Sequence, residues 1–171
     1  MGDSASGLTP ITPASYLLDA VTRLNRATVQ IGNERLRPWK FTLSSYVALR
    51  VIADQPHLTL TQLSQRCFAR PQTITRMVTE LQRRGFVERA GRPGDERAMS
   101  LTLTPGGRDV LIQMEPVVNK INDTIAAVLT AEQIVEVDDL LRGCAHAVER
   151  DIAAAAAAKK TSVNGQGLPS G

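Results

Sequence analysis

Residues 58–107 read LTLTQLSQRCFARPQTITRMVTELQRRGFVERAGRPGDERAMSLTLTPGG, and this stretch decides the fold. Its first half holds two apolar patterns with helical spacing, expected as helices over about 61–68 and 71–84. The apolar positions of the second helix are Ile74, Met77, Val78 and Leu81. Only Ala69 and Arg70 separate the two helices, and such a tight connection predicts a helix-turn-helix.

The spacing of the apolar residues changes after Gly85, which ends the second helix. Residues 86–89 have the composition of a short strand, and 99–103 alternate between apolar and polar residues as a second strand does. Between them, 91–96 combines Gly, Pro and Asp, which is the chemistry of a turn. We therefore expect a β-hairpin with a basic tip, which makes this a winged helix-turn-helix.

Helical patterns flank this stretch on both sides. A first helix is expected from Pro13 and must end before Pro38, and a second spans about 43–53. Two long helices follow the hairpin and begin at Pro105 and Ala131. The expected fold class is mostly α with a small β-hairpin wing, a winged helix-turn-helix plus a helical dimerisation region. The expected parts are a flexible N-terminus over 1–11, an N-terminal dimerisation helix over 12–37, the winged helix-turn-helix DNA-binding domain over 42–104, C-terminal dimerisation helices over 105–153 and a disordered tail over 159–171.

Charge is unevenly distributed along the chain. Residues 60–97 hold eight arginines against four acidic residues, whereas 98–152 hold four basic residues against nine acidic ones. A basic centre beside an acidic C-terminal third is typical of a nucleic-acid-binding face attached to a scaffold that does not bind. Chance segregation of solvated charges gives the same totals, so charge supports this interpretation without deciding it.

The helix expected over 71–84 has a second face of the kind that contacts DNA. Opposite its apolar stripe it presents hydroxyl, amide and guanidinium groups, which suit base edges and phosphates in a major groove. An ordinary solvated helix face is the alternative, but such faces favour Lys and Glu. The residues of this region that we predict to bind DNA are Arg70, Gln72, Thr73, Thr75, Arg76 and Thr79.

Three segments of the chain resemble the MarR family (multiple antibiotic resistance regulators). They are LTLTQLSQR at 58–66, TITRMVTELQRRGFVER at 73–89 and GDERAMSLTLTPGG at 94–107. With the flanking helices, the resemblance covers most of residues 13–152. It implies a homodimeric, mostly helical regulator of triangular shape that binds double-stranded DNA, usually a repressor released by a small molecule or an oxidant.

The same resemblance assigns roles on the wing and marks two departures from the family pattern. It implies that Arg97 reaches into the minor groove and that Asp95 orients it, and Arg92 joins them among the predicted DNA-binding residues. Phe68 stands where members commonly have a small residue, often glycine. Arg70 stands where a Ser or Asp cap is frequent, and we interpret it as exchanging capping for a phosphate contact.

The two long C-terminal helices carry apolar seams whose spacing alternates between three and four residues. Such seams favour helix-on-helix packing between two copies of the chain. For either helix alone, the alternative is a stripe of the chain's own core. The residues predicted to hold a homodimer are Leu17, Val21, Leu111, Met114, Val118, Ile121, Ile134, Val137, Leu141 and Val148.

A small-molecule effector site is also expected, because the resemblance places a pocket between the dimerisation helices and the winged domain. Aromatic and cationic side chains suit an aromatic anion. The candidates are Tyr16, Trp39, Phe41, Tyr46 and Arg50. The alternative, in which Tyr46 belongs to the core and Trp39 covers the helix junction, stays open.

Other classes of protein lack support in the sequence. The two cysteines, Cys67 and Cys144, form no CxxC, and the two histidines lie far apart, so we expect no metal, no cofactor and no enzyme. Both cysteines are expected in apolar packing rather than as redox sensors. The start has no signal-peptide pattern and no apolar run spans a bilayer, so a cytoplasmic protein without a membrane partner is expected. A winged-helix module that binds protein instead of DNA remains the alternative.

Overall fold

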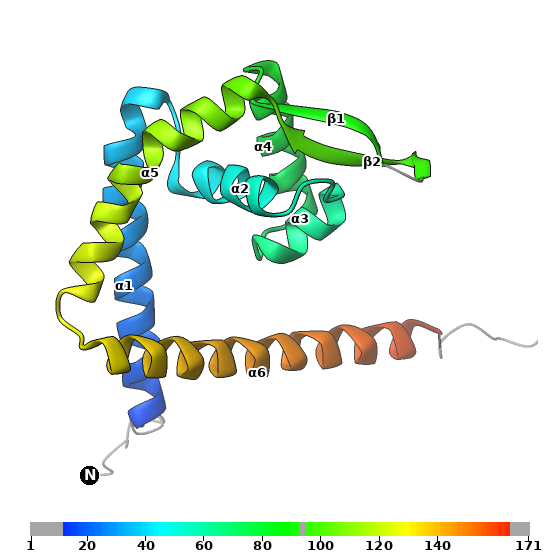
Figure 1. Ribbon diagram of the computed structural model, residues 1–171. Helices are drawn as coiled ribbons and strands as arrows, with labels where there is room; N and C mark the ends of the chain where they lie inside the picture. The colour runs from blue at the N-terminus through cyan, green and yellow to red at the C-terminus, as the bar shows by residue number, and fades with distance from the viewer. Residues whose placement is uncertain (1–11, 93–94, 165–171) are drawn as a thin grey trace, which may run out of the picture. The chain divides into compact units, whose positions relative to one another are not determined.

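The computed structural model describes residues 12–92 and 95–164, and the side chains of 12–91 and 99–158. Its helices are α1 (Pro13–Leu36), the short 3-10 helix η1 (Arg37–Trp39), α2 (Leu43–Asp54), α3 (Leu60–Arg66), α4 (Pro71–Arg83), α5 (Pro105–Ala126) and α6 (Ala131–Asn164). Strands β1 (Val87–Arg92) and β2 (Asp95–Leu103) form one antiparallel hairpin (Figure 1). The expected fold class is confirmed. The chain divides into two compact units, residues 1–122 and 123–171.

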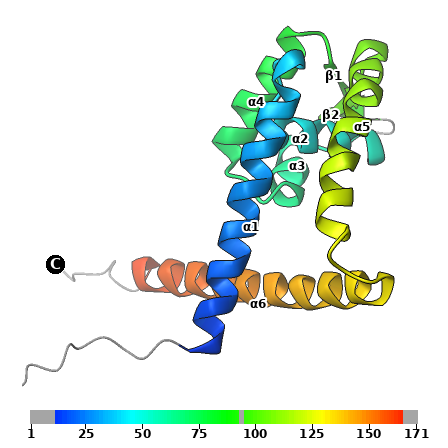
Figure 2. The same cartoon turned by 90° about the vertical axis from the view of Figure 1, so that its left-hand side faces the viewer.

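The core of the first unit lies where the end of α1 meets α2, α3, α4, the hairpin and α5. Figure 2 shows α1 as one continuous helix whose C-terminal end reaches these elements, and Leu36 at that end is fully buried. The buried apolar residues of this cluster are Leu36, Phe41, Tyr46, Leu49, Ile52, Leu58, Leu63, Ile74, Val78, Leu81, Val87, Leu101, Val110, Leu111, Met114 and Val118.

Local hydrogen bonds start the central helices at the expected places. The Thr42 hydroxyl accepts from the backbone N–H of Ser45, and Thr59 does the same for Gln62, so α2 and α3 begin with capping boxes. α4 begins at Pro71, whose missing N–H costs nothing at a first helical position. Gly85, with a φ of 75°, follows the end of α4 in the left-handed conformation that glycine tolerates.

The hairpin is regular near the domain and irregular toward its tip. Val87 pairs with Leu103 and Arg89 with Leu101, and the register shifts between Gly91 and Arg92. The loop before α3 adds a bridge, because the backbone of Leu58 pairs with Leu101.

One detail of the expected alternation along β2 is wrong. Met99 is 53% exposed, whereas Ser100 is fully buried. The Ser100 hydroxyl donates to the carbonyl of Ala90 at 3.1 Å, so its burial leaves that hydroxyl satisfied.

The apolar seam of α5 packs inside the first unit. Leu111, Met114 and Val118 belong to the core cluster, and Ile121 is also buried. The interpretation of these four residues as a surface seam for a second copy is therefore corrected. Their neighbours in the same chain already cover them, and the alternative stated above, a stripe of the chain's own core, describes α5.

The second unit consists mainly of α6, which is longer than expected. The helix continues to Asn164, so the expected disordered tail over 159–171 is wrong for residues 159–164. The run of alanines at 153–158 explains this, because alanine has the highest helix propensity and a helix once formed propagates readily. The expectations for residues 1–11 and 165–171 lie outside the described residues.

Apolar side chains on α1 and α6 remain exposed in the single chain. On α1, Leu17 is 50% exposed and Val21 41%, and on α6 the seam residues Ile134, Val137, Leu141 and Val148 are all exposed. Among the described residues, no helix combines the length and the apolar character needed to cross a membrane.

Candidate nucleic-acid interface

Helix α4 has two chemically different faces. Ile74 and Val78 are fully buried and Leu81 is 1% exposed, so this stripe anchors the helix to the core. The opposite face is open to solvent. Its exposed residues are Gln72, Thr73, Thr75, Arg76 and Thr79. The structure thus places these five predicted DNA-binding residues together on one outward surface.

The hydroxyls on this face are held by the helix itself. Thr75 donates to the carbonyl of Pro71 at 2.9 Å, and Thr79 donates to the carbonyl of Thr75 at 2.8 Å. Each hydroxyl oxygen therefore keeps its acceptor lone pairs for an outside donor, such as an exocyclic amine in a major groove. The guanidinium of Arg76 complements them because it is a donor only.

The turn between α3 and α4 is tight and partly strained. The Ser64 hydroxyl donates to the carbonyl of Ala69 at 2.6 Å, which ties the turn to α3. Phe68 adopts a φ of 48° and is 79% exposed, so the departure from glycine noted above places a large side chain in a left-handed conformation. Arg70 occupies the N-cap position of α4 without a capping hydrogen bond, and its exposed side chain remains available to another partner.

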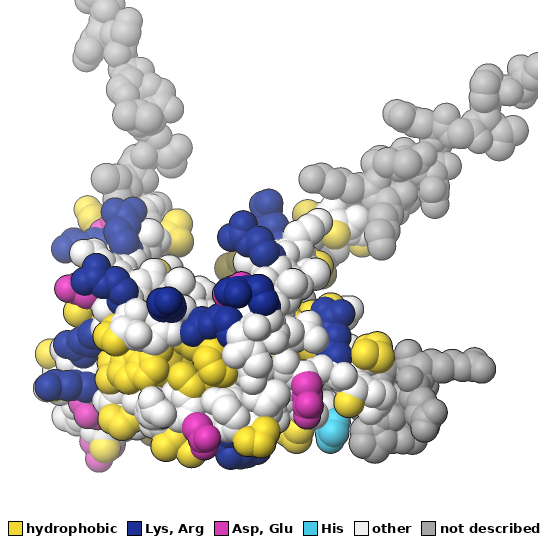
Figure 3. Space-filling view, turned by 90° about the horizontal axis from the view of Figure 1, so that it is seen from above, with side chains coloured by type: hydrophobic (Ala, Val, Ile, Leu, Met, Phe, Trp, Pro, Cys, Tyr) yellow, Lys and Arg dark blue, Asp and Glu magenta, His cyan; other side chains and the backbone are white. Residues whose placement is uncertain are grey.

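Basic side chains border the outer face of α4. A hollow of about 670 Å³ lies between α4 and the start of α2, with Lys40, Arg76, Arg83 and Arg84 among its lining residues. Lys and Arg side chains gather along one side of the face seen from above (Figure 3). Arg83 is engaged by Glu80 through two hydrogen bonds of 2.7 and 2.8 Å, and these lower the pKa of the Glu80 carboxyl.

For the predicted DNA-binding residues of the wing, the structure describes only the backbone. The backbone of Arg92, Asp95 and Arg97 lies in β1 and β2, but their side chains lie outside the described part of the structure. The backbone alone places all three at the far end of the hairpin, where the register becomes irregular. Their roles in DNA binding remain predictions.

The structure places the five predicted effector residues in different environments. Phe41 and Tyr46 are buried in the core, and burial followed by the nearby Glu115 raises the pKa of Tyr46. Arg50 is paired with Asp54 at 3.2 Å and with Glu115. Tyr16 is 66% exposed on α1. The alternative that assigns Tyr46 to the core is the one that its burial supports.

Trp39, one of those five residues, lines a pocket at the junction of α1, η1 and α5. The pocket has a volume of about 380 Å³, and its lining residues are Arg35, Pro38, Trp39, Pro116, Val117 and Lys120. Arg35 and Lys120 are cationic members that the sequence analysis did not single out. No local pattern marks them, because their helices are adjacent only in the folded chain.

The two cysteines differ in environment. Cys67 is half-buried against the core, and burial raises the pKa of its thiol, so the reactive thiolate is disfavoured. Cys144 is exposed on α6 in the single chain rather than packed as expected. Within the described residues, no group of three or more His, Cys, Asp or Glu side chains is arranged to hold a metal ion.

Comparison with known proteins shows which family this architecture matches. Residues 39–98 match the family model described as MarR family. The HTH-type transcriptional repressor Rv2887 of Mycobacterium tuberculosis is 31% identical over 127 residues, which cover 74% of this chain and 89% of that relative.

Solved structures agree with this assignment. A crystal structure of a cysteine-to-serine mutant of MarR from E. coli, complexed with operator DNA, matches with a TM-score of 0.67 and 25% identity, covering 75% of this chain and 93% of that one. The apo form of wild-type MarR from E. coli matches with a TM-score of 0.63 and 26% identity, covering 79% and 98%.

The chain contains a winged helix-turn-helix in which the polar face of α4 is exposed to solvent. Its similarity to a transcriptional repressor over 74% of its length, and to MarR solved with operator DNA, defines it as a DNA-binding transcriptional regulator of the repressor type. The chain belongs to the MarR family.

Proposed function

We propose that the chain acts as a homodimeric repressor that binds a pseudo-palindromic operator through α4 and the wing. The two-faced character of α4 is the observation that carries this proposal. A buried stripe of Ile74, Val78 and Leu81 fixes the helix, while its polar face is left to an outside partner. The MarR structure from E. coli that this chain resembles was determined with operator DNA, which supports the same partner here.

Within this proposal, the predicted residues divide between reading bases and contacting the backbone. Thr73, Thr75, Arg76 and Thr79 reach base edges and flanking phosphates from the exposed face of α4, together with Gln72. Arg70 contacts a phosphate from the N-cap position. On the wing, Arg97 enters the minor groove, where a narrow groove concentrates negative potential, with Asp95 and Arg92 beside it.

Dimerisation is supported by apolar surface that one chain leaves uncovered. Leu17 and Val21 on α1, and Leu141 on α6, are between 38% and 50% exposed, although each lies on an apolar stripe at helical spacing. A second copy that covers these stripes removes that area from water. A dimer also sets the distance between the two copies of α4. Half-sites that lie one helical turn apart on DNA require a distance of about 34 Å between them.

Release by a small molecule completes the proposal, and the pocket beside Trp39 is the place we assign to the effector. One guanidinium nitrogen of Arg35, Nη1, is buried without a hydrogen-bond partner among the described residues. An unsatisfied buried donor of this kind favours an incoming acceptor. An aromatic anion supplies both the acceptor and a ring to lie against Trp39 and Pro116, which line the same pocket.

The test is DNA binding measured by fluorescence anisotropy at two salt concentrations. The probe is the duplex that the wild-type protein selects from a randomised pool, compared with a scrambled duplex of equal length. Arg76→Ala should weaken binding to the selected duplex by about 1–3 kcal/mol and relax selection at one position. Arg23→Ala is the matched control, because it removes the same charge from the exposed surface of α1.

Two results contradict the proposal. Equal affinity for the selected and scrambled duplexes in the wild-type protein would mean that α4 does not read sequence. Absence of any DNA binding at low salt would favour the other class, a winged-helix module that binds protein.

A further inference from the structure

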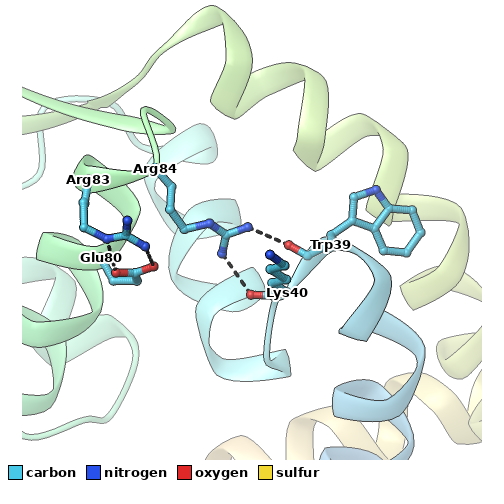
Figure 4. Close-up of polar contacts among 5 residues, drawn as sticks. All are labelled: Trp39, Lys40, Glu80, Arg83 and Arg84. Carbon is cyan, nitrogen blue, oxygen red and sulfur yellow. Dashed lines mark hydrogen bonds and ion pairs between the residues drawn. The ribbon is translucent and has the colours of Figure 1, made fainter.

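Arg84 differs from the other basic residues around α4. It is the C-cap residue of that helix, and its guanidinium turns back into the molecule, whereas the adjacent Arg83 has a side chain 72% exposed and pairs with Glu80 (Figure 4). The contacts of this side chain therefore require their own explanation.

The hydrogen bonds of Arg84 end on a distant part of the chain. Its Nη2 donates to the carbonyl of Trp39 at 2.6 Å and its Nη1 to the carbonyl of Lys40 at 2.9 Å. These carbonyls lie in the α1–α2 junction, which we define as residues 37–42. Trp39 ends η1, and Lys40 follows it with a φ of 56°, so the carbonyls of this turn lack helical partners. A cation is the preferred partner for carbonyls at a helix C-terminus.

Aromatic contacts reinforce the same link. The guanidinium carbon of Arg84 lies 4.5 Å from the ring centroid of Phe41 and 4.8 Å from that of Phe86. Phe41 belongs to the junction, and Phe86 lies between α4 and β1, two residues after Arg84. The two rings also contact each other, with centroids 5.6 Å apart. A planar guanidinium can hydrogen-bond in its plane while it packs against rings, and lysine cannot reproduce this combination.

The junction that Arg84 holds is also attached to α5. The indole N–H of Trp39 donates to the side-chain oxygen of Gln113 at 3.2 Å. A continuous set of contacts thus runs from α5 through Trp39 and Arg84 to the C-terminal end of α4. The opposite, N-terminal part of α4 carries Gln72, Thr73 and Arg76, so a small rotation at Arg84 displaces these side chains.

We propose that Arg84 is a positioning residue that fixes the angle of α4 against the α1–α2 junction and thereby sets the preference for operator over non-specific DNA. The proposal rests on the DNA-binding function proposed above. Non-specific binding depends mainly on charge near phosphates, whereas operator binding needs the helix correctly placed in the groove. A positioning residue therefore affects the ratio of the two affinities.

The experiment compares Arg84→Met, Arg84→Lys and Arg83→Met in the full-length protein. Affinities for the selected and scrambled duplexes are measured by anisotropy at two salt concentrations. Acrylamide quenching of tryptophan emission is measured without DNA, because Trp39 is the single tryptophan and reports on the junction. Arg83→Met is the matched control, since it removes one charge from the neighbouring position without touching the junction.

We expect Arg84→Met to lose on the order of tenfold in affinity for the selected duplex, while affinity for the scrambled duplex changes by less than about twofold. Quenching of Trp39 should increase. Arg84→Lys should recover part of the ratio, because it keeps one donor but not the planar fork. Arg83→Met should keep the wild-type ratio and the wild-type quenching.

Other outcomes overturn the proposal. Equal losses on both duplexes, with a reduced salt dependence, would make Arg84 a phosphate contact. An unchanged ratio in a folded Arg84→Met protein would mean that the contacts at the junction do not place α4. If Arg84→Met does not fold, Arg84→Lys decides the question, and a wild-type ratio and wild-type quenching in that variant refute the proposal. If the wild-type protein itself shows no preference, the proposed function fails, while Trp39 quenching still tests whether Arg84 holds the junction.

Discussion

The start of α5 approaches the backbone of Phe86 closely, which makes Gly107 the glycine where one added methyl group should be most damaging. The Thr104 hydroxyl donates to the carbonyl of Gly85 at 2.6 Å and accepts from the N–H of Gly107 at 3.0 Å. These bonds hold the first turn of α5 against the backbone of Phe86. A Cβ on Gly107 would lie 2.9 Å from the carbonyl carbon of Phe86 and closer still to its oxygen.

That geometry sets the size of the effect. Real Cβ atoms essentially never lie within 3.0 Å of a non-bonded atom, and the obstructing atoms here belong to the backbone. The start of α5 or the Phe86 peptide must therefore retreat, which strains the capping bonds of Thr104. Because overpacking costs about 1–3 kcal/mol when side chains can yield, we expect Gly107→Ala to lower the free energy of unfolding by roughly 3 kcal/mol or more. The melting temperature should fall by on the order of 10 °C.

Gly106→Ala is the control, because it should raise the free energy of unfolding rather than lower it. The nearest atoms to a Cβ on Gly106 lie 3.8 Å away, so a methyl group fits. Alanine should then stabilise the helix by roughly 0.5–1 kcal/mol relative to glycine. Urea denaturation followed by circular dichroism measures both variants at one protein concentration. A Gly107→Ala protein as stable as the wild type would refute the argument from close approach.

Three further predictions concern the turn, the wing and the dimer. Phe68→Gly should raise the free energy of unfolding by about 1 kcal/mol, because glycine tolerates the positive φ and the exposed ring contributes little packing; a lower urea midpoint would contradict this. Arg97→Ala should weaken binding to all duplexes, most at sites flanked by A·T runs, and Asp95→Ala should partly mimic it; full operator affinity at physiological salt would mean that the wing does not touch DNA. Leu141→Glu should shift the protein toward monomer in sedimentation and weaken operator binding with it, and an unchanged dimer would exclude this part of α6 from the interface.

Much of the fold and the exposed polar face of α4 were predictable because they depend on local rules. Helix starts followed from Thr and Pro at the right positions, and the start of α4 at Pro71 is an example. The two faces of α4 followed from the spacing of Ile74, Val78 and Leu81, because a helix repeats every 3.6 residues whatever surrounds it. The residues predicted on its outer surface are all exposed.

Periodicity shows which side of a helix is apolar, but it does not say what covers that side. The seams of α5 and α6 look alike in the sequence, yet Met114 on α5 is fully buried by its own chain while Leu141 on α6 is exposed. The aromatic candidates for an effector site have different surroundings for the same reason. Phe41 is buried in the core, whereas Trp39 lines a pocket. Composition identified these side chains, and packing decided what each of them contacts.

The contacts between distant segments were decided by the tertiary structure alone. Arg84 meets the carbonyls of Trp39 and Lys40 across more than forty residues, and Arg50 meets Glu115 across sixty-five. The sequence by itself determined the helices, the hairpin, the polar face of α4 and the family, because these follow from neighbouring residues and short motifs. It did not determine the link from α5 through Trp39 to Arg84, because such a link exists only once the core has brought three separate helices together.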